Sequence, residues 1–329
     1  MVPFDSSDPE SGVRAFRWHD LPFAYRMAGT GTSLDTQLGL TVGDDNLHHA
    51  LLTGTGRTQI YVLREREQEA MGVVHFLPES QQSRLAYLAP SLNALPHENL
   101  WLKLLDGLTR MAGRRGVINM IAEIDESAPE LEVLRESNFG VYSRQFIWER
   151  PAGPLDLDDE LDPVLQPMTT IDEGSALALY SMLVPRLMQQ VEPPPTSADT
   201  VYVLRGDMQV EGVLAVYRGP HRTLFDVYLH PRTYRAAPNM IRHALELLRA
   251  DSRPICCRVR SYMDWVSPTL ADLGFEYLTE QAVMVRHLAA RIGKYAFSSV
   301  GLAENVSLLT KLTISTLERD ETTAYWNVN

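Results

Sequence analysis

The sequence predicts an α/β protein built from two tandem copies of one domain, each a mixed, mostly antiparallel sheet flanked by helices. The main observation is an internal repeat. Tyr61–Arg64 recurs as Tyr202–Arg205, which is 202 − 61 = 141 positions later, and Pro90 recurs as Pro231 at the same shift. A shift that persists along the chain indicates a duplicated domain. The second observation is that both copies predict the same order of strands and helices, βαβββαβαβ, which is typical of an α/β arrangement with a mixed sheet.

The first copy begins with a short strand and a helix, for which Asp20 is a suitable N-cap residue. Two strands that form a hairpin follow, then a third strand, and then helices and strands in alternation. The helix Pro96–Ala112 begins at a proline, which is favoured at the first helical position because its missing N–H is not needed there. The elements of the first copy are Val13–Trp18, Leu21–Met27, Gln59–Arg64, Ala70–Leu77, Arg84–Ala89, Pro96–Ala112, Val117–Ile124, Pro129–Ser137 and Val141–Glu149.

The second copy repeats this order, with Asp172 ahead of its first helix and a proline at the start of helix Pro238–Ala250. Its elements are Val164–Pro167, Ala176–Leu183, Thr200–Arg205, Val210–Tyr217, Thr223–His230, Pro238–Ala250, Ile255–Arg260, Pro268–Leu273 and Tyr277–His287.

These elements divide the chain into four parts. Residues 1–150 form the first domain, 151–163 a linker, 164–287 the second domain and 288–329 an extension without a counterpart in the first copy. The linker holds five carboxylates and three prolines, which is typical of a solvated connection. Within the extension, Leu302–Leu317 predicts a helix that docks back on a domain.

Composition excludes several classes of protein. The net charge of −12 argues against a nucleic-acid partner, because phosphate binding depends on clustered Lys and Arg. No apolar run reaches the roughly 18 residues of a membrane span, and the N-terminus lacks the apolar stretch of a signal peptide. Cys256 and Cys257 are adjacent, and neighbouring cysteines rarely form a disulfide. We therefore expect a cytoplasmic protein without nucleic-acid or membrane partners, either a monomer with an internal pseudo-dimer or a weak homodimer.

The end of the second copy carries the clearest motif. Leu270-Ala-Asp-Leu-Gly-Phe275 precedes the last strand, and Leu134–Phe139 is its twin with Asn138 in place of glycine. With the order of elements, this motif resembles the GNAT superfamily of N-acetyltransferases. Leu229-His230-Pro231 is similar to the end of the family's fourth strand. The resemblance covers residues 12–287 as two copies, and it implies an acyl-CoA-dependent N-acyltransferase that uses acetyl-CoA as co-substrate.

The family binds the acyl-CoA pyrophosphate on backbone N–H groups at a loop-to-helix junction with the pattern Gln/Arg-x-x-Gly-x-Gly/Ala. A helix N-terminus offers unpaired donors there, and glycine lets the backbone approach phosphate closely. The second copy keeps the Arg, whereas Pro238, which has no N–H, and Met240 stand at the glycine positions. The first copy, at Ser91–Pro96, has neither Arg nor glycine. The second copy is thus the better candidate for acyl-CoA, and the resemblance assigns its binding to Val227, Leu229, Arg235, Ala236, Ala237, Asn239 and Met240.

Acetylation of an amine needs a base for the amine proton and a donor for the leaving thiolate. Alternation along Thr223–His230 places Asp226, Tyr228 and His230 on one face of the strand that lines the family's cleft. Asp226 is therefore a candidate base and Tyr228 a candidate site residue. The alternative for Asp226 is an exposed position on a half-buried strand.

The family's usual acid, a tyrosine, is replaced by Leu134 and Leu270. Tyr262, just after strand Ile255–Arg260, is a candidate substitute, and its alternative role is to pack on Trp265. Cys256 and Cys257, within the predicted strand, are expected to be core residues.

Other sequence patterns give weaker indications of a functional site. His48-His49 lacks further ligands at metal spacing, so we expect a solvated helix end and no metal site. Gly29–Thr32 and Gly54–Arg57 lack the Lys and Ser/Thr of a nucleotide-binding P-loop and predict turns. Pro193–Pro195 is a stiff stretch that serves either to shape the acceptor pocket or as a rigid connection.

The sequence thus favours an N-acyltransferase for a small amine, in which the first copy is structural or shapes the acceptor site. A different reading is a non-catalytic protein that binds acyl-CoA or another ligand as a sensor or scaffold, which the altered phosphate loop favours. A third reading, transfer of an aminoacyl group from tRNA, conflicts with the net charge of −12.

Overall fold

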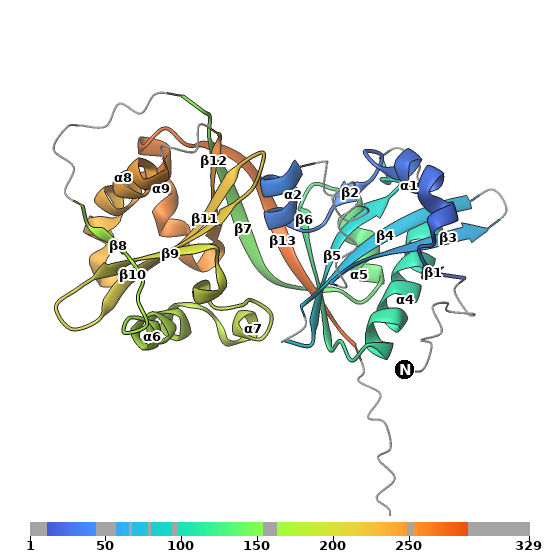
Figure 1. Ribbon diagram of the computed structural model, residues 1–329, viewed down its shortest axis with the longest axis horizontal. Helices are drawn as coiled ribbons and strands as arrows, with labels where there is room; N and C mark the ends of the chain where they lie inside the picture. Colours follow the sequence, from blue (N-terminus) through green and yellow to red (C-terminus); the bar gives the residue numbers. More distant parts are fainter. Residues whose placement is uncertain are drawn as a thin grey trace, which may run out of the picture. The chain divides into compact units, whose positions relative to one another are not determined.

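The computed structural model describes residues 12–43, 57–65, 68–77, 80–93, 98–153, 163–248 and 253–288, and the strands of both copies join in one sheet (Figure 1). His48-His49, most of the acidic linker and the Leu302–Leu317 helix of the sequence analysis lie outside these residues. The division of the chain into two domains therefore stays a prediction, and we refer below to the first half (residues up to 150) and the second half (residues 163–288).

The elements of the first half follow the predicted order, with β2 and α2 inserted between α1 and β3. Its strands are β1 (Arg14–Ala15), β2 (Thr32–Ser33), β3 (Thr58–Glu65), β4 (Gln68–Leu77), β5 (Gln82–Ala89), β6 (Asn119–Asp125) and β7 (Gly140–Arg150). Its α-helices are α1 (Leu21–Met27), α2 (Thr36–Val42), α4 (Glu98–Arg114) and α5 (Glu130–Glu136), and a 3₁₀ turn, η1 (Trp18–Asp20), precedes α1.

The second half repeats the arrangement. Its strands are β8 (Leu165–Pro167), β9 (Thr200–Arg205), β10 (Val210–Arg218), β11 (Thr223–Leu229), β12 (Ile255–Arg260) and β13 (Glu276–His287). Its α-helices are α6 (Glu173–Leu183), α7 (Arg186–Gln189), α8 (Ala237–Leu248) and α9 (Ser267–Asp272). Its 3₁₀ turns are η3 (Pro195–Ser197), η4 (Pro231–Ala236) and η5 (Ser261–Val266).

The last strands of the two halves are exchanged. β13 lies between β6 and β7 and pairs antiparallel with both, while β7 pairs on its other side with β12 (Figure 1). The strand order is β1-β3-β4-β5-β6-β13-β7-β12-β11-β10-β9-β8, and β2 pairs with β5. Within the described residues only β5–β6 and β11–β12 are parallel pairs. The prediction of a mixed, mostly antiparallel sheet is confirmed, and each half completes its sheet with a strand from the other.

Helices cover both faces of the sheet. α4 buries Leu100, Leu104 and Leu108 along one side, at the helical spacing of four residues, against one face of the first half. α8 and α9 cover the same face in the second half, where they pack on Phe225 and Leu229 of β11. α1 and α6 cover the opposite face. We call this opposite face the α1/α6 face.

Helix α2 joins the two halves on the α1/α6 face. It contacts β10 and β11 of the second half, and the Thr41 carbonyl accepts a hydrogen bond of 3.1 Å from the His221 N–H. The fit at the β10–β11 turn is close, because a Cβ on Gly219 would lie 2.1 Å from the Thr41 oxygen. The sequence does not predict α2, which is seven residues long and has a glycine at its centre.

Two further differences concern strand ends. The strand expected over Val13–Trp18 is limited to Arg14–Ala15, because a 3₁₀ turn begins at Trp18 and Asp20 is bound to Arg14 by two hydrogen bonds of 2.7 Å. His230, expected on β11, lies just beyond the strand as the N-cap of η4, where its ring accepts a hydrogen bond from the Arg232 N–H.

Candidate functional site

A cluster of charged and amide side chains lies on the α1/α6 face where the two halves meet. Its members are buried or nearly so, and we call them the central polar cluster: Thr36, Arg84, Glu123, Gln145, Glu192, Asp226, Arg258, Arg260 and Gln281. The sheet register brings them together. Gln281 of β13 is the register partner of Gln145 on β7, which in turn faces Arg260 on β12. The exchange of strands therefore creates the cluster from residues of both halves.

Hydrogen bonds connect the amides of the cluster to its charges. The Gln145 amide nitrogen donates to Gln281 Oε1 (2.7 Å) and to Thr36 Oγ1 (3.1 Å). The Gln145 oxygen accepts from the Arg260 guanidinium, which also donates to Glu192 Oε1 at 2.9 and 3.1 Å. Three arginines (Arg84, Arg258, Arg260) face three acids (Glu123, Glu192, Asp226), so the formal charges cancel. A buried group of this kind is tolerated when its members are paired.

Glu123 occupies the middle of the three arginines. Its Oε2 accepts from the Thr36 N–H at 3.0 Å, while its Oε1 lies 3.5–3.8 Å from guanidinium nitrogens of Arg84, Arg258 and Arg260. Burial by itself raises the pKa of the Glu123 carboxyl, but the three guanidiniums together outweigh it and hold that pKa well below its usual range. Glu123 is therefore ionised at neutral pH.

We expect Glu123 to make the stability of the fold sensitive to acid. Its pKa is lower in the folded chain than in the unfolded chain (about 4.3 for Glu), so the carboxylate stabilises the fold above that pH, and this stability is lost as the pH falls towards the folded-state pKa. Urea unfolding of Glu123→Gln should show a smaller loss of midpoint between pH 6 and pH 3 than the wild type. The exposed Glu132 provides the control, since Glu132→Gln should keep the wild-type dependence. Equal dependence in all three proteins would contradict this role.

Asp226, the candidate base of the sequence analysis, is buried and bound to Arg258. Its two oxygens accept hydrogen bonds of 2.8 and 2.6 Å from the Arg258 guanidinium, whose strand position is in register with it. All seven residues of β11 are buried, so the alternative of an exposed Asp226 is wrong. This bidentate pair is a strong contact that occupies both carboxylate oxygens.

Tyr228 and Tyr262, the other two candidate catalytic residues, converge on Glu192. The Tyr228 hydroxyl lies 3.4 Å from Glu192 Oε1, and the Tyr262 hydroxyl lies 3.4 Å from Glu192 Oε2. Burial, reinforced by the Glu192 charge, raises the pKa of both phenols well above the usual value, so both stay protonated. Glu192 was not singled out in the sequence, although it directly precedes Pro193–Pro195.

A cavity of about 700 Å³ opens beside the central polar cluster, and we call it the junction cavity. Its first-half wall includes Arg57, His75 and Arg84, and its second-half wall includes Glu192, Pro194 and Tyr217. Asp35, just before α2, also faces it. The volume suits a small organic ligand. Pro193 and Pro194 line the cavity, as expected if the proline stretch shapes a pocket.

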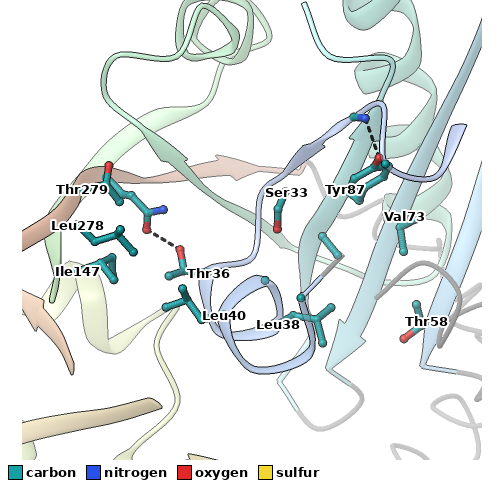
Figure 2. A pocket seen from close by; sticks show the side chains of 16 residues that line it. Ser33, Thr36, Leu38, Leu40, Thr58, Val73, Tyr87, Ile147, Leu278 and Thr279 are labelled. Carbon is teal, nitrogen blue, oxygen red and sulfur yellow. Dashed lines mark hydrogen bonds between the residues drawn. The ribbon is translucent and has the colours of Figure 1, made fainter. Parts of the chain in front are cut away.

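A second cavity of about 270 Å³ lies beside α2, and we call it the α2 cavity. Figure 2 shows Ser33, Thr36 and Leu38 entering it from the segment around α2, with Tyr87 and Val73 from the sheet and Thr279 opposite. The Tyr87 hydroxyl accepts from the Gly31 N–H at 2.7 Å and donates to the Met27 carbonyl at 3.1 Å. Its lining is uncharged.

In the first half, the gap between the parallel strands β5 and β6 is filled by the chain itself. The two strands pair only over Gln82–Arg84. Beyond that point Leu34 bridges them, since its N–H donates to the Ala86 carbonyl (2.9 Å) and its carbonyl accepts from the Glu123 N–H (2.8 Å). A Cβ on Gly31 would lie 2.2 Å from the Leu88 oxygen, so glycine permits this close approach.

The loop that follows β5 is also occupied. The buried Glu130 carboxylate accepts hydrogen bonds at its Oε1 from the Leu92 N–H (3.0 Å), the Ser91 hydroxyl (3.0 Å) and the Thr32 hydroxyl (2.8 Å). The Glu130 carboxylate thus occupies the N–H and hydroxyl donors to which an anionic ligand would bind at this position.

The second half differs at the equivalent place. β11 and β12 pair over Thr223–Asp226, and beyond that point the Glu192 side chain lies between Tyr228 and Arg260. Among the described residues, no backbone hydrogen bond joins residues 184–197 to β11 or β12. In the second half, the space between β11 and β12 beyond Asp226 is therefore filled by side chains and not by backbone.

The residues assigned to acyl-CoA fall into two groups. Arg235 and Asn239 are exposed and Ala236 is half-buried, whereas Val227 and Leu229 of β11 and Ala237 and Met240 of α8 are buried in the core between the two elements. The Arg232 and Thr233 N–H groups are bound to His230, and the Ala237 N–H is bound to the Tyr234 carbonyl. Arg235 and the neighbouring Arg232 are exposed, so their guanidinium groups are available to bind a phosphate.

The cysteines fit their expected role. Both are buried and unpaired, and Cys257 lies in the core under α8. Burial raises the pKa of Cys256 to about 12, so its thiol is protonated at neutral pH and is not a nucleophile. In the part of the chain that the structure describes, no group of His, Cys, Asp and Glu is arranged to bind a metal ion, and no helix is long and apolar enough to cross a membrane.

No protein-family model matches the chain, and no curated protein matches it in sequence. Solved structures similar to it include a GCN5-related N-acetyltransferase from Sphaerobacter thermophilus, with a TM-score of 0.54 and 12% identity, over 84% of this chain and 95% of that one. Another is a tandem GNAT protein from the clavulanic acid biosynthesis pathway, solved without acetyl-CoA, with a TM-score of 0.51 and 13% identity, over 84% of this chain and 98% of that one. The chain therefore has the fold of the GNAT acetyltransferases, as its sequence motifs predict.

Proposed function

We propose that the protein is an acyl-CoA-dependent N-acyltransferase for a small amine, with acyl-CoA in the second half and the amine in the junction cavity. The observation that carries this proposal is Glu192, a carboxylate that lines a ligand-sized cavity while two protonated tyrosines lie 3.4 Å from its oxygens. A base for the amine and an acid for the thiolate are the two groups that the reaction requires.

The second half is the better place for acyl-CoA because the first-half gap is filled by Leu34 and by Glu130. In the second half the gap beyond Asp226 is closed by side chains, which can move, and the exposed Arg235 precedes α8. We assign the pantetheine arm to the edge of β11 at Val227 and Leu229, and the phosphates to Arg235 with Asn239 nearby.

In the transfer step, the amine nitrogen attacks the thioester carbonyl, the C–N bond forms and the C–S bond breaks. The amine loses a proton to Glu192 Oε2, and Tyr262 gives its proton to the departing thiolate and regains one from Glu192. The 3.4 Å contact between Tyr262 and Glu192 Oε2 supports this relay. Asp226 then has a positioning role, because it holds Arg258 beside Glu123.

Arg235→Ala should weaken the binding of acetyl-CoA by about 1–3 kcal/mol, the free energy of one charge-assisted contact to phosphate. Calorimetric titration with acetyl-CoA measures it. Arg186→Ala, which removes an exposed arginine from α7, is the matched control and should bind as the wild type does. Unchanged binding in Arg235→Ala, or loss on substitution of Ser91 and Leu92, would place acyl-CoA elsewhere.

A second candidate function is a non-catalytic ligand-binding protein. It is favoured by the state of the loop before α8, where Pro238 has no N–H and several other N–H groups are bound to His230 and Tyr234. The same titration separates the two functions, because a ligand that binds only the folded state must raise its stability. Binding of acetyl-CoA without transfer to any amine supports the sensor, and binding with release of free CoA thiol in the presence of amines supports the enzyme.

A further inference from the structure

The two walls of the junction cavity differ in chemistry. Arg57, His75 and Arg84 come from the first half, and Glu192 and Tyr217 come from the second. Burial lowers the pKa of His75, Asp35 partly offsets this, and the Arg84 and Arg57 charges lower it further, so the imidazole is neutral at pH 7. Asp35, Arg57 and Arg84 line the same cavity as His75. The positive charge of this wall therefore belongs to the two guanidiniums.

Arg84 has donor capacity that the protein leaves unused. Its Nη1 is buried without a hydrogen-bond partner and lies 3.5 Å from Glu123 Oε1, beyond ordinary hydrogen-bond distance, and the same oxygen is shared with Arg258 and Arg260. The side chain is 11% exposed and that exposure faces the junction cavity. A buried donor without a hydrogen-bond partner is costly, so a ligand group that accepted a hydrogen bond from this guanidinium would stabilise it.

Arg57 provides a second guanidinium on the same wall. It is exposed, lines the junction cavity, and makes no ion pair within the residues that the structure describes. Two guanidiniums on one wall suit an anionic group, and their planar forks match a carboxylate in particular. A phosphate dianion is disfavoured because Asp35 and Glu192 line the same cavity.

We propose that the acceptor is a zwitterion whose carboxylate binds Arg57 and Arg84 on the first-half wall while its amino group faces Glu192 on the second-half wall. The substrate class is thus an amino acid or a similarly small amine that bears a carboxylate. This proposal rests on the proposed function, which it deepens by assigning acceptor recognition to the half whose own strand gap is filled.

The test measures binding in the absence of acyl-CoA. An equimolar mixture of the common amino acids and a matched mixture of their decarboxylated amines are added separately to the full chain, and the melting temperature is recorded. We expect the amino acids to raise it and the amines to leave it unchanged. The components that act are then titrated singly against wild type, Arg57→Gln and Arg84→Lys, with Arg17→Gln, an exposed arginine outside the cavity, as control.

Arg57→Gln should weaken amino-acid binding at least about tenfold, the effect of losing one charge-assisted contact. Arg84→Lys, which keeps the charge beside Glu123 but loses the planar fork, should also weaken it. Arg17→Gln should bind as the wild type does. No stabilisation by amino acids, equal stabilisation by the amines, or equal affinity in Arg57→Gln and Arg17→Gln would overturn the proposal.

Failure of this proposal is distinguishable from failure of the proposed function. If acetyl-CoA binds and amines without a carboxylate are acetylated as fast as amino acids, the transferase function is supported and the zwitterion site is contradicted. If amino acids bind in an Arg57-dependent way but acetyl-CoA does not bind at all, the carboxylate site is supported and the transferase function is contradicted.

Discussion

Glu192→Gln is expected to lower the turnover of acyl transfer by about 10²–10⁴-fold, the usual cost of losing a general base. The substitution keeps the size of the side chain and an acceptor for Arg260 and Tyr228, but it removes the oxygen that takes the proton from the amine. Binding of acetyl-CoA should stay unchanged. Steady-state rates followed through the release of CoA thiol, together with calorimetry, provide the two measurements.

The matched control is Glu173→Gln, which neutralises an exposed acid in the first turn of α6 and should leave the rate unchanged. The dependence of the rate on pH provides a second readout, since loss of the base should abolish the acidic limb of the profile. Wild-type turnover in Glu192→Gln would remove Glu192 from the mechanism.

Asp226→Ala is expected to destabilise the fold by about 3–5 kcal/mol, because it leaves the Arg258 guanidinium buried without its bidentate partner. Arg258 is 3% exposed, so water cannot replace the lost oxygens. Urea unfolding followed by circular dichroism measures the change. The double variant Asp226→Leu/Arg258→Met, which removes both charges, should recover most of the stability.

The same pair also tests the role assigned to Asp226 from the sequence. Asp226→Asn keeps the shape of the side chain. If it folds with near wild-type stability and loses turnover by more than tenfold, while Glu192→Gln keeps wild-type turnover, Asp226 is the base and the assignment to Glu192 is wrong. A stability loss in Asp226→Ala below about 1 kcal/mol would show that the pair does not hold the cluster together.

The sequence predicted the order of elements well because the repeat and the local patterns both report on it. β9 and β12 have the bounds expected from the sequence, and Leu270–Phe275 correctly indicated the fold. α2 was missed because Thr36–Val42 lacks a regular apolar stripe, and contacts with the β10–β11 turn support it instead. Tertiary contacts of this kind are absent from any local pattern.

The candidate site was predicted in part. Asp226, Tyr228 and Tyr262 lie around one cluster, but Arg258, Glu123 and Glu192 were missed. Arg258 and Arg260 carried a usable signal, since they alternate with Cys257 and Val259 on a strand flanked by apolar residues. Alternation places the arginines on one face. Finding their partners requires the register of β12 and β13 against β7, which pairs residues more than 100 positions apart.

The position of β13 has a consequence for how the chain reaches its native state during synthesis. Strand β6 is made near residue 125, but the strand that covers its open edge ends at residue 287. Until that strand is made, the first half exposes an unpaired sheet edge, and such edges are the sites at which nascent chains associate wrongly. More than 150 further residues must therefore be synthesised after β6 before β13 can pair with it (287 − 125 = 162). The protein is accordingly expected to depend on chaperones that shield nascent β-strands, and neither half expressed alone should give a stable domain.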